Sequence, residues 1–215
     1  MVNDIKFFKI KMEPITKKTK YVLETLNNSG ITKDFYLAKG TALALQIGHR
    51  LSIDLDWFSP NFKYDANFRK KLSELGNLVI NEELEDTFDG SLDGVRISFF
   101  NYPYPLIGPT IQYMSNVRLA SKEDIAVMKL EAIAGRGDYK DFIDIHFLLQ
   151  YFTLEEIFKK LEEKFKGFDY NKMHLIKSLN YFDDVKKGEM PQMIKDIDWE
   201  KIKKEIRKAV KQIVN

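Results

Sequence analysis

The stretch Phe35–Phe58, FYLAKGTALALQIGHRLSIDLDWF, decides the fold that we expect for this chain. It opens with a short apolar run that predicts a buried strand, and Ala42–Ile47 predicts a helix that Gly48 ends. Along Ser52–Phe58 apolar and polar residues alternate, which predicts a half-buried strand. The order strand, Gly-Thr turn, helix, strand therefore predicts an α+β core.

Two carboxylates share the polar face of the Ser52–Phe58 strand. Asp54 and Asp56 occupy alternate positions, so their Cβ atoms should lie roughly 7 Å apart, given a rise of ~3.3 Å per residue. Such a pair can bind Mg²⁺ or Mn²⁺, with water and substrate phosphate completing the coordination. Metal ions held in this way stabilise the attacking and leaving oxygens of phosphoryl transfer. The alternative is a solvated polar face on an edge strand, because the pattern Asp-x-Asp is common.

The turn upstream of the carboxylates has features of a phosphate-binding site. Gly40 allows close approach of a phosphate, and Thr41 offers a hydroxyl or a helix cap. Backbone N–H groups at the start of the following helix can donate to the same anion. Arg50 and Ser52 precede the two carboxylates and are further candidates for phosphate contacts. A plain helix cap is the alternative interpretation of Gly40 and Thr41.

After Leu119 the sequence becomes mainly helical. Ser121–Asp124 resembles a capping box, and helices are expected near 121–134, 139–151, 153 onward, 171–181 and 198–214. In the first part we expect helices near 16–28 and 66–75, strands near 78–85 and 94–102, and a turn at 89–94. The sequence thus predicts an α+β domain with a small mixed sheet over residues 1–119, followed by a helical bundle over residues 120–215.

A lysine within an apolar helix face gives a second signal. Lys129 shares its face with Ile125 and Ala132, and a lysine in such surroundings must bind an anion or extend to solvent. A triphosphate would serve, and so would a structural carboxylate. Asp141 and Asp144 lie on the next predicted helix, where Asp144 could anchor Lys129 or act near the acceptor. A buried Lys–Asp pair that joins two helices is the alternative.

Composition narrows the possible classes of function. The 215 residues include 34 basic and 32 acidic side chains, so any basic surface for nucleic acid must be local. The absence of cysteine excludes disulfides, thiolate metal sites and a cysteine nucleophile. Met1–Met12 lacks the apolar region of a signal peptide, and no stretch approaches the ~18 apolar residues of a membrane span. We expect a cytoplasmic protein without membrane contact.

Two blocks of the sequence resemble the AbiEii family, nucleotidyltransferase toxins of abortive-infection toxin–antitoxin pairs. The family's first motif is Gly-Gly-Ser/Thr, a gap, then Asp-x-Asp. Phe35–Leu45 and Gly48–Phe58 are similar to it, except that Lys39 replaces the first Gly. The later motif is a Lys-Leu helix followed by Lys/Arg-Asp-x-x-Asp-Leu, which Met128–Ile133 and Lys140–Ile145 resemble. The resemblance covers roughly residues 30–150.

This resemblance implies a nucleotidyltransferase-like fold and the transfer of a nucleotide from an NTP to an acceptor, with Mg²⁺ or Mn²⁺ as cofactor. It implies catalytic roles for Lys129 and Asp144 beside the metal ligands Asp54 and Asp56. It also implies an RNA acceptor, such as tRNA, and a separate antitoxin protein as partner. These last expectations rest on the family alone.

One departure leaves other functions open. Nucleotidyltransferases usually carry a third carboxylate on a later strand, and the candidate strand 94–100 offers Ser98 at that place. Asp93 is a weak substitute before the strand, and Asp144 could fill the role from the helical half. The missing acid favours the alternative of a non-catalytic nucleotide- or partner-binding module. A two-metal phosphodiesterase is a further alternative, against which the Gly-Thr turn favours a triphosphate.

Overall fold

A computed structural model describes residues 12–135, 137–168, 170–183, 185 and 189–214. Most of Met1–Met12, the segment for which we expect no signal peptide, lies outside these ranges. The helices are α1 (Lys17–Ser29), α2 (Lys39–Ile47), α3 (Ala66–Ser73), α4 (Lys122–Gly135), α5 (Tyr139–Leu148), α6 (Leu154–Lys164), α7 (Lys172–Asn180) and α8 (Trp199–Val214). The strands are β1 (Tyr36–Leu37), β2 (Leu55–Ser59), β3 (Leu78–Leu84), β4 (Thr87–Leu92), β5 (Val95–Asn101), β6 (Ile111–Met114) and β7 (Val117–Leu119).

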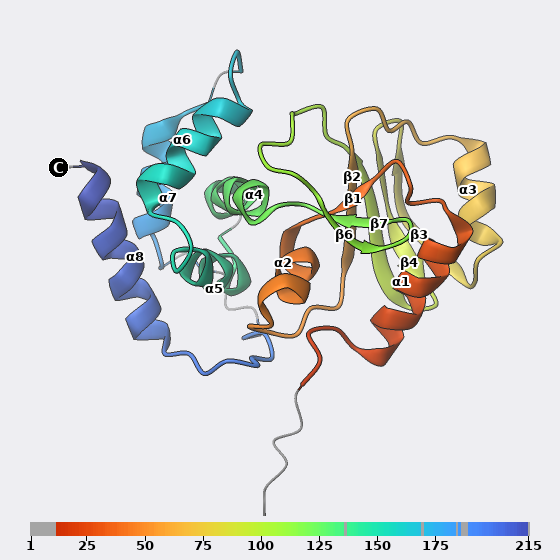
Figure 1. Cartoon of the computed structure of the whole chain (residues 1–215), viewed down its shortest axis with the longest axis horizontal. Coiled ribbons are helices and arrows are strands. Elements are labelled where there is room, and N and C mark those ends of the chain that lie inside the picture. The colour runs from red at the N-terminus through yellow and green to blue at the C-terminus, as the bar shows by residue number, and fades with distance from the viewer. Residues whose placement is uncertain (1–11, 136, 169, 184, 186–188, 215) are drawn as a thin grey trace, which may run out of the picture.

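One mixed sheet holds all the strands of the described residues, in the order β3-β4-β5-β2-β1-β7-β6. β2 is its central strand, parallel to β5 and antiparallel to β1. Helices α1 and α3 lie to one side of the sheet, whereas α2 and the C-terminal helices lie to the other (Figure 1). The predicted α+β architecture, a mixed sheet followed by helices, is confirmed.

Local sequence signals explain several helix ends. The Thr16 side chain accepts a hydrogen bond from the Thr19 N–H and caps α1, and Gly30 ends that helix with φ 70°. Gly48, with φ 58°, ends α2 as predicted. Thr153 and Glu156 form a complete capping box at the start of α6. These helices could therefore be placed from their caps as well as from their apolar faces.

The predicted turn at 89–94 is wrong for most of its length. Residues 87–92 form β4, which pairs with both β3 and β5. Phe88 and Leu92 are fully buried on the same face. Gly90 fits because a Cβ there would lie 2.4 Å from the Val79 carbonyl oxygen of β3. Burial of alternate residues outweighs the turn-prone composition, and the turn is confined to the residues that follow Leu92.

The predicted strand at Ser52–Phe58 also needs correction at its start. β2 begins only at Leu55, and Ile53, which the alternation placed in the core beside Leu55 and Trp57, is 55% exposed. Ser52 instead forms an isolated bridge with Ile15. The chain pairs elsewhere before β2 begins, so the alternation of the strand does not extend back to Ile53.

The sheet ends at Leu119 and α4 begins at Lys122, close to the expected domain boundary. One cluster of buried apolar residues nevertheless runs from the sheet into the C-terminal helices. The division into domains 1–119 and 120–215 therefore stays a prediction. Among the described residues, no helix has both the length and the apolar character needed to cross a membrane.

Candidate functional site

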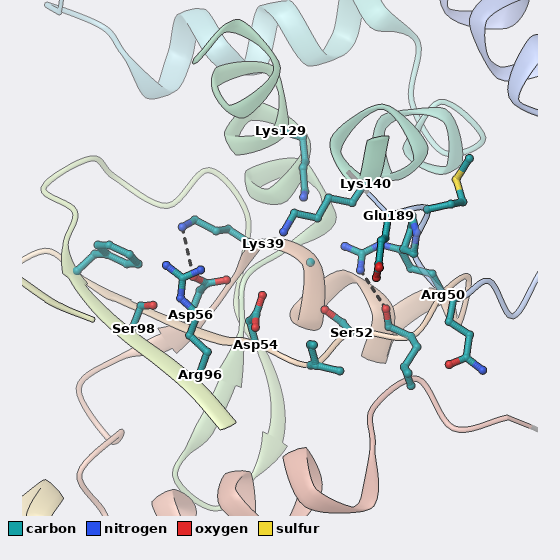
Figure 2. A pocket seen from close by; sticks show the side chains of 17 residues that line it. Lys39, Arg50, Ser52, Asp54, Asp56, Arg96, Ser98, Lys129, Lys140 and Glu189 are labelled. Carbon is teal, nitrogen blue, oxygen red and sulfur yellow. Dashed lines mark hydrogen bonds and ion pairs between the residues drawn. The ribbon is translucent and has the colours of Figure 1, made fainter. Parts of the chain in front are cut away.

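A cavity of about 390 Å³ lies beside the central strand. Its walls come from the start of α2, the segment leading into β2, β5, α4, α5 and the segment before α8. Cations and carboxylates face the same space (Figure 2). The basic lining residues are Lys39, Arg50, Arg96, Lys129 and Lys140, and the acidic ones are Asp54, Asp56 and Glu189. Such a mixture suits a polyanionic ligand together with a cation.

The two carboxylates predicted from the Asp-x-Asp pattern both line this cavity. Asp56 lies in β2, and Asp54 is the residue immediately before that strand. Asp56 forms an ion pair with Lys39, with 3.3 Å between Lys39 Nζ and Asp56 Oδ1. In the part of the chain that the structure describes, the Asp54 carboxylate has neither a hydrogen bond nor an ion pair. It is therefore available to a ligand in the cavity.

The start of α2 is shaped around Gly40. A Cβ on Gly40 would lie 2.4 Å from Nη2 of Arg50 and 3.3 Å from Oγ of Ser52, so only glycine fits without a shift. Lys39 has φ 55°, in the left-handed region that favours glycine. The loop thus has a backbone that suits the family's first glycine, although a lysine occupies the position.

Thr41 does not cap α2, contrary to one of the two roles expected for it. Ala38 is the N-cap residue and makes no side-chain cap hydrogen bond. The Thr41 hydroxyl donates to Oγ of Ser52 at 2.8 Å and lies against the Asp54 carbonyl oxygen. Thr41 is buried, whereas Gly40, Arg50 and Ser52 line the cavity. Thr41 therefore joins α2 to the segment that positions the first carboxylate, and its phosphate contact stays a prediction.

A buried network of charges supports the cavity wall. Arg50 donates two hydrogen bonds to Asp144, from Nε at 2.7 Å and from Nη2 at 2.8 Å. His49 Nε2 lies 2.7 Å from the same carboxylate. Lys129 Nζ lies 2.6 Å from Asp144 Oδ2 and 2.8 Å from Asp141 Oδ1. The Lys129 side chain thus fits both interpretations: it joins two helices as a buried ion pair, and it also lines the cavity where an anion could bind.

The network fixes the charge of its members. Burial disfavours an ionised Asp144, but the charges of Lys129 and Arg50 and the hydrogen bonds it accepts outweigh this and hold its pKa well below the ordinary value. Burial also opposes the charge of Lys129, yet Asp144 and Asp141 raise its pKa. Burial lowers the pKa of His49 despite the nearby carboxylate. A neutral His49 therefore donates its Nε2 proton to Asp144.

The predicted absence of a third strand carboxylate is visible in the register of the sheet. Ser98 of β5 lies beside Asp56 of β2 and lines the cavity. Its hydroxyl donates to Asp89 of β4 at 3.1 Å, and Asp89 also accepts two hydrogen bonds from Arg96. Asp93, the suggested substitute, lies in the turn after β4 and accepts from the Asn77 N–H. It does not line the cavity.

Several lining residues were not singled out from the sequence. Lys39 stood out only as a departure from the family motif, Lys140 only as part of the second block, and Arg96 only as a strand residue. The segment before α8 reaches the site because the Leu51 N–H donates to the Gln192 carbonyl at 2.8 Å and the Ile194 N–H to that of His49 at 3.0 Å. No sequence signal predicts this contact, because it depends on how the helical half packs.

The donor set fits a divalent cation that shares its ligands with substrate. Asp54 and Asp56 supply carboxylate oxygens, which Mg²⁺ and Mn²⁺ prefer. Within the described ranges, no cluster of three or more His, Cys, Asp or Glu side chains is placed to hold a metal. The protein would therefore provide two carboxylates, and phosphate oxygens and water would provide the remaining ligands, as is common for Mg²⁺.

Comparisons with known proteins agree with the fold and with the family that the two blocks resemble. A sequence profile described as nucleotidyl transferase AbiEii toxin, type IV toxin–antitoxin system, matches residues 95–212, more than half of the chain. An uncharacterized protein of Aquifex aeolicus (strain VF5) is 35% identical over 208 residues, which cover 94% of this chain and 98% of that protein. The profile's range includes Lys129, Asp141 and Asp144.

Two solved structures share the fold at low sequence identity. A putative nucleotidyltransferase from H. pylori superposes with a TM-score of 0.55 and 17% identity, covering 91% of this chain and 93% of that one. MenT4, a nucleotidyltransferase toxin from Mycobacterium tuberculosis H37Rv, gives a TM-score of 0.54 and 11% identity, with coverage of 90% and 83%. The arrangement of sheet and helices is thus one that nucleotidyltransferases use.

Proposed function

This chain belongs to the AbiEii family of nucleotidyltransferase toxins, and we propose that it transfers a nucleotide from an NTP to an acceptor hydroxyl with the help of Mg²⁺ or Mn²⁺. The observation that carries this proposal is the composition of the cavity. Asp54 and Asp56 lie at one wall, and five basic side chains face the same space. A metal-bound triphosphate has the charge pattern that this wall complements.

Each group has a proposed part in the transfer. Asp54 and Asp56 hold the cation, which neutralises charge on the phosphates. Lys129, Lys140 and Arg96 contact phosphate oxygens, and Gly40 lets the chain approach them closely. The acceptor oxygen forms a bond to the α-phosphorus while the bond from that phosphorus to the bridging oxygen breaks, and pyrophosphate leaves with the bonding electrons.

Asp144 acts as a positioning residue in this proposal. It is fully buried and accepts hydrogen bonds or ion pairs from Arg50, His49 and Lys129. Because its pKa is well below the ordinary value, it is too weak a base to remove the acceptor proton efficiently. It instead orients Lys129 toward the cavity, and the proton passes to solvent.

Family membership also supports the choice of partners. The profile describes toxins of type IV toxin–antitoxin systems, so we propose that a cognate antitoxin protein opposes this chain in the cytoplasm. The acceptor that we propose is RNA, with tRNA as the first candidate.

The metal and nucleotide parts of the proposal can be tested without knowing the acceptor. Mg²⁺ or Mn²⁺ together with an NTP should raise the melting temperature, because ligands that bind the folded state stabilise it. The double variant Asp54→Asn, Asp56→Asn should remain folded and lose this increase. A matched variant, Lys63→Met, changes an exposed lysine that does not line the cavity and should keep this increase. An unchanged increase in the double variant would place the metal elsewhere.

The acceptor is identified by labelling. The protein is incubated with each labelled NTP and total cellular RNA, and the products are separated by size. Label in tRNA is expected; label in protein or in no macromolecule would refute the RNA acceptor. Nucleotide binding without any transfer would favour the alternative of a non-catalytic module.

A further inference from the structure

Lys39 has a backbone conformation that its side chain does not favour. Its φ is 55°, in a region where a Cβ meets steric resistance and glycine does not. The family motif has glycine at this position, and the loop keeps the corresponding shape. A lysine in such a conformation persists when its surroundings hold it there. The contacts of its side chain therefore indicate what the lysine contributes.

The side chain of Lys39 lies against Asp56, one of the two proposed metal ligands. Its ammonium lies 3.3 Å from Asp56 Oδ1 and 4.4 Å and 5.1 Å from the ring centroids of Phe100 and Phe58. A carboxylate and two aromatic faces each attract a cation. The side chain is only 32% exposed, and Figure 2 shows it directed along the cavity wall to Asp56. The protein thus supplies its own cation at one of the two proposed metal ligands.

The strand beside Asp56 shows the complementary change. Ser98 lies next to Asp56 in the sheet, where a carboxylate would bind a second metal ion together with Asp56. The nearest acid, Asp89, is engaged by Arg96 and by the Ser98 hydroxyl. Among the described residues no third acid joins Asp54 and Asp56. Compared with a site that binds two divalent cations, this site therefore lacks one carboxylate and has one additional ammonium group, that of Lys39.

These two changes balance in charge. A divalent cation together with one carboxylate carries the same net charge as a single ammonium group. Replacing the first pair by Lys39 therefore leaves the total charge that faces a triphosphate unchanged. Two metal ions otherwise stabilise the two reacting oxygens of phosphoryl transfer, and a lysine can act on phosphate as a point charge.

We propose that the Lys39 ammonium takes the place of the second metal ion, so that the chain binds a single divalent cation per nucleotide. The cation sits at Asp54 and Asp56, and Lys39 neutralises the outer side of Asp56 and contacts the phosphates. The inference rests on the proposed function, since it concerns the same nucleotide site. It assigns Lys39 a function that the glycine of the family motif cannot perform.

Counting bound Mn²⁺ tests this proposal without using activity. The full chain is titrated with Mn²⁺ in the presence of a non-hydrolysable ATP analogue, and free Mn²⁺ is measured by electron paramagnetic resonance. The wild-type chain should bind one Mn²⁺. The double variant Lys39→Gly, Ser98→Asp, which removes the ammonium and supplies the acid, should bind two. Its melting temperature, measured alongside, establishes that it is folded.

The single variant Lys39→Gly provides a second readout. Without nucleotide, its affinity for Mn²⁺ should rise roughly three- to ten-fold, because a positive charge next to Asp56 has been removed. The variant Lys63→Ala, which removes an exposed lysine elsewhere, should leave that affinity unchanged. Two Mn²⁺ ions on the wild-type chain, or an unchanged affinity in Lys39→Gly, would overturn the role of Lys39 and leave the proposed function standing. Failure of the wild-type chain to bind any Mn²⁺ would overturn both.

Discussion

Lys129 is a buried cation between two buried carboxylates. Its side chain is 3% exposed and contacts Asp141 and Asp144. In Lys129→Met both acids lose this partner, and breaking a buried ion pair typically costs about 3–5 kcal/mol. We expect a loss of unfolding free energy of that size in urea denaturation. A stability within about 0.5 kcal/mol of wild type would mean that water or another cation replaces the lysine.

His49 gives the molecule a defined pH dependence. Its pKa is lowered from 6.5 by burial, so the unfolded chain binds a proton that the folded chain does not. The stability is complete above about pH 6.5 and falls as the pH drops toward the lowered pKa, by at most about 1.4 kcal/mol per pH unit for one proton. His49→Gln can still donate to Asp144 and should show a smaller slope between about pH 6.5 and 5. An unchanged slope would show that His49 titrates normally in the folded state.

At the residue scale the sequence predicts which side chains belong to the site better than it predicts which side chains contact one another. Asp54 and Asp56 could be placed at one site because residues two apart in extended chain face the same way. Ser98 could be placed there because nucleotidyltransferases usually carry a carboxylate on the strand that holds it. The pairing of Arg50 with Asp144 could not be predicted, because the two residues are 94 positions apart. Whether a buried arginine meets a phosphate or a carboxylate depends on which helix packs beside it.

Among the elements, α2 has a start whose geometry depends on one glycine, Gly40. In Gly40→Ala the new Cβ would lie 2.4 Å from the Arg50 guanidinium, which must then move from Asp144. We expect a loss of about 1–3 kcal/mol in unfolding free energy, together with weaker NTP binding in a thermal-shift titration. Gly135→Ala in α4 meets no atom within 4 Å and should preserve both quantities. Equal behaviour of the two variants would contradict the close fit at Gly40.

Elements with a strong period were predicted well, and those with mixed signals were not. α8 buries Ile202, Ile206 and Val210, three of the residues that its periodicity places inward. β4 was missed because its middle residues Asp89, Gly90 and Ser91 are typical of turns, although β3 and β5 both pair with it. Pairing with neighbouring strands and burial of Phe88 are tertiary effects, so local propensity could not reveal them.

At the scale of the whole molecule, the sheet and the C-terminal helices share one core. Asp144 in the helical half binds Arg50 and His49 in the first half, and the apolar cluster is continuous. We therefore propose that the two predicted domains unfold together. Trp57 lies in β2 and Trp199 in α8, so Trp199→Phe leaves one tryptophan that reports on the sheet. Its fluorescence transition should coincide with the loss of helical circular dichroism, whereas separate midpoints would indicate independent domains.

The central claim is that the cavity transfers the nucleotide part of an NTP. Matched incubations with cellular RNA and Mg²⁺ use ATP, GTP, CTP or UTP labelled with ³²P at either the α- or the γ-phosphate. We expect that α-label becomes attached to RNA, that γ-label is released as pyrophosphate, and that the folded variant Asp54→Asn, Asp56→Asn attaches neither. Transfer of γ-label to RNA, or equal transfer of α-label by this variant, would contradict it.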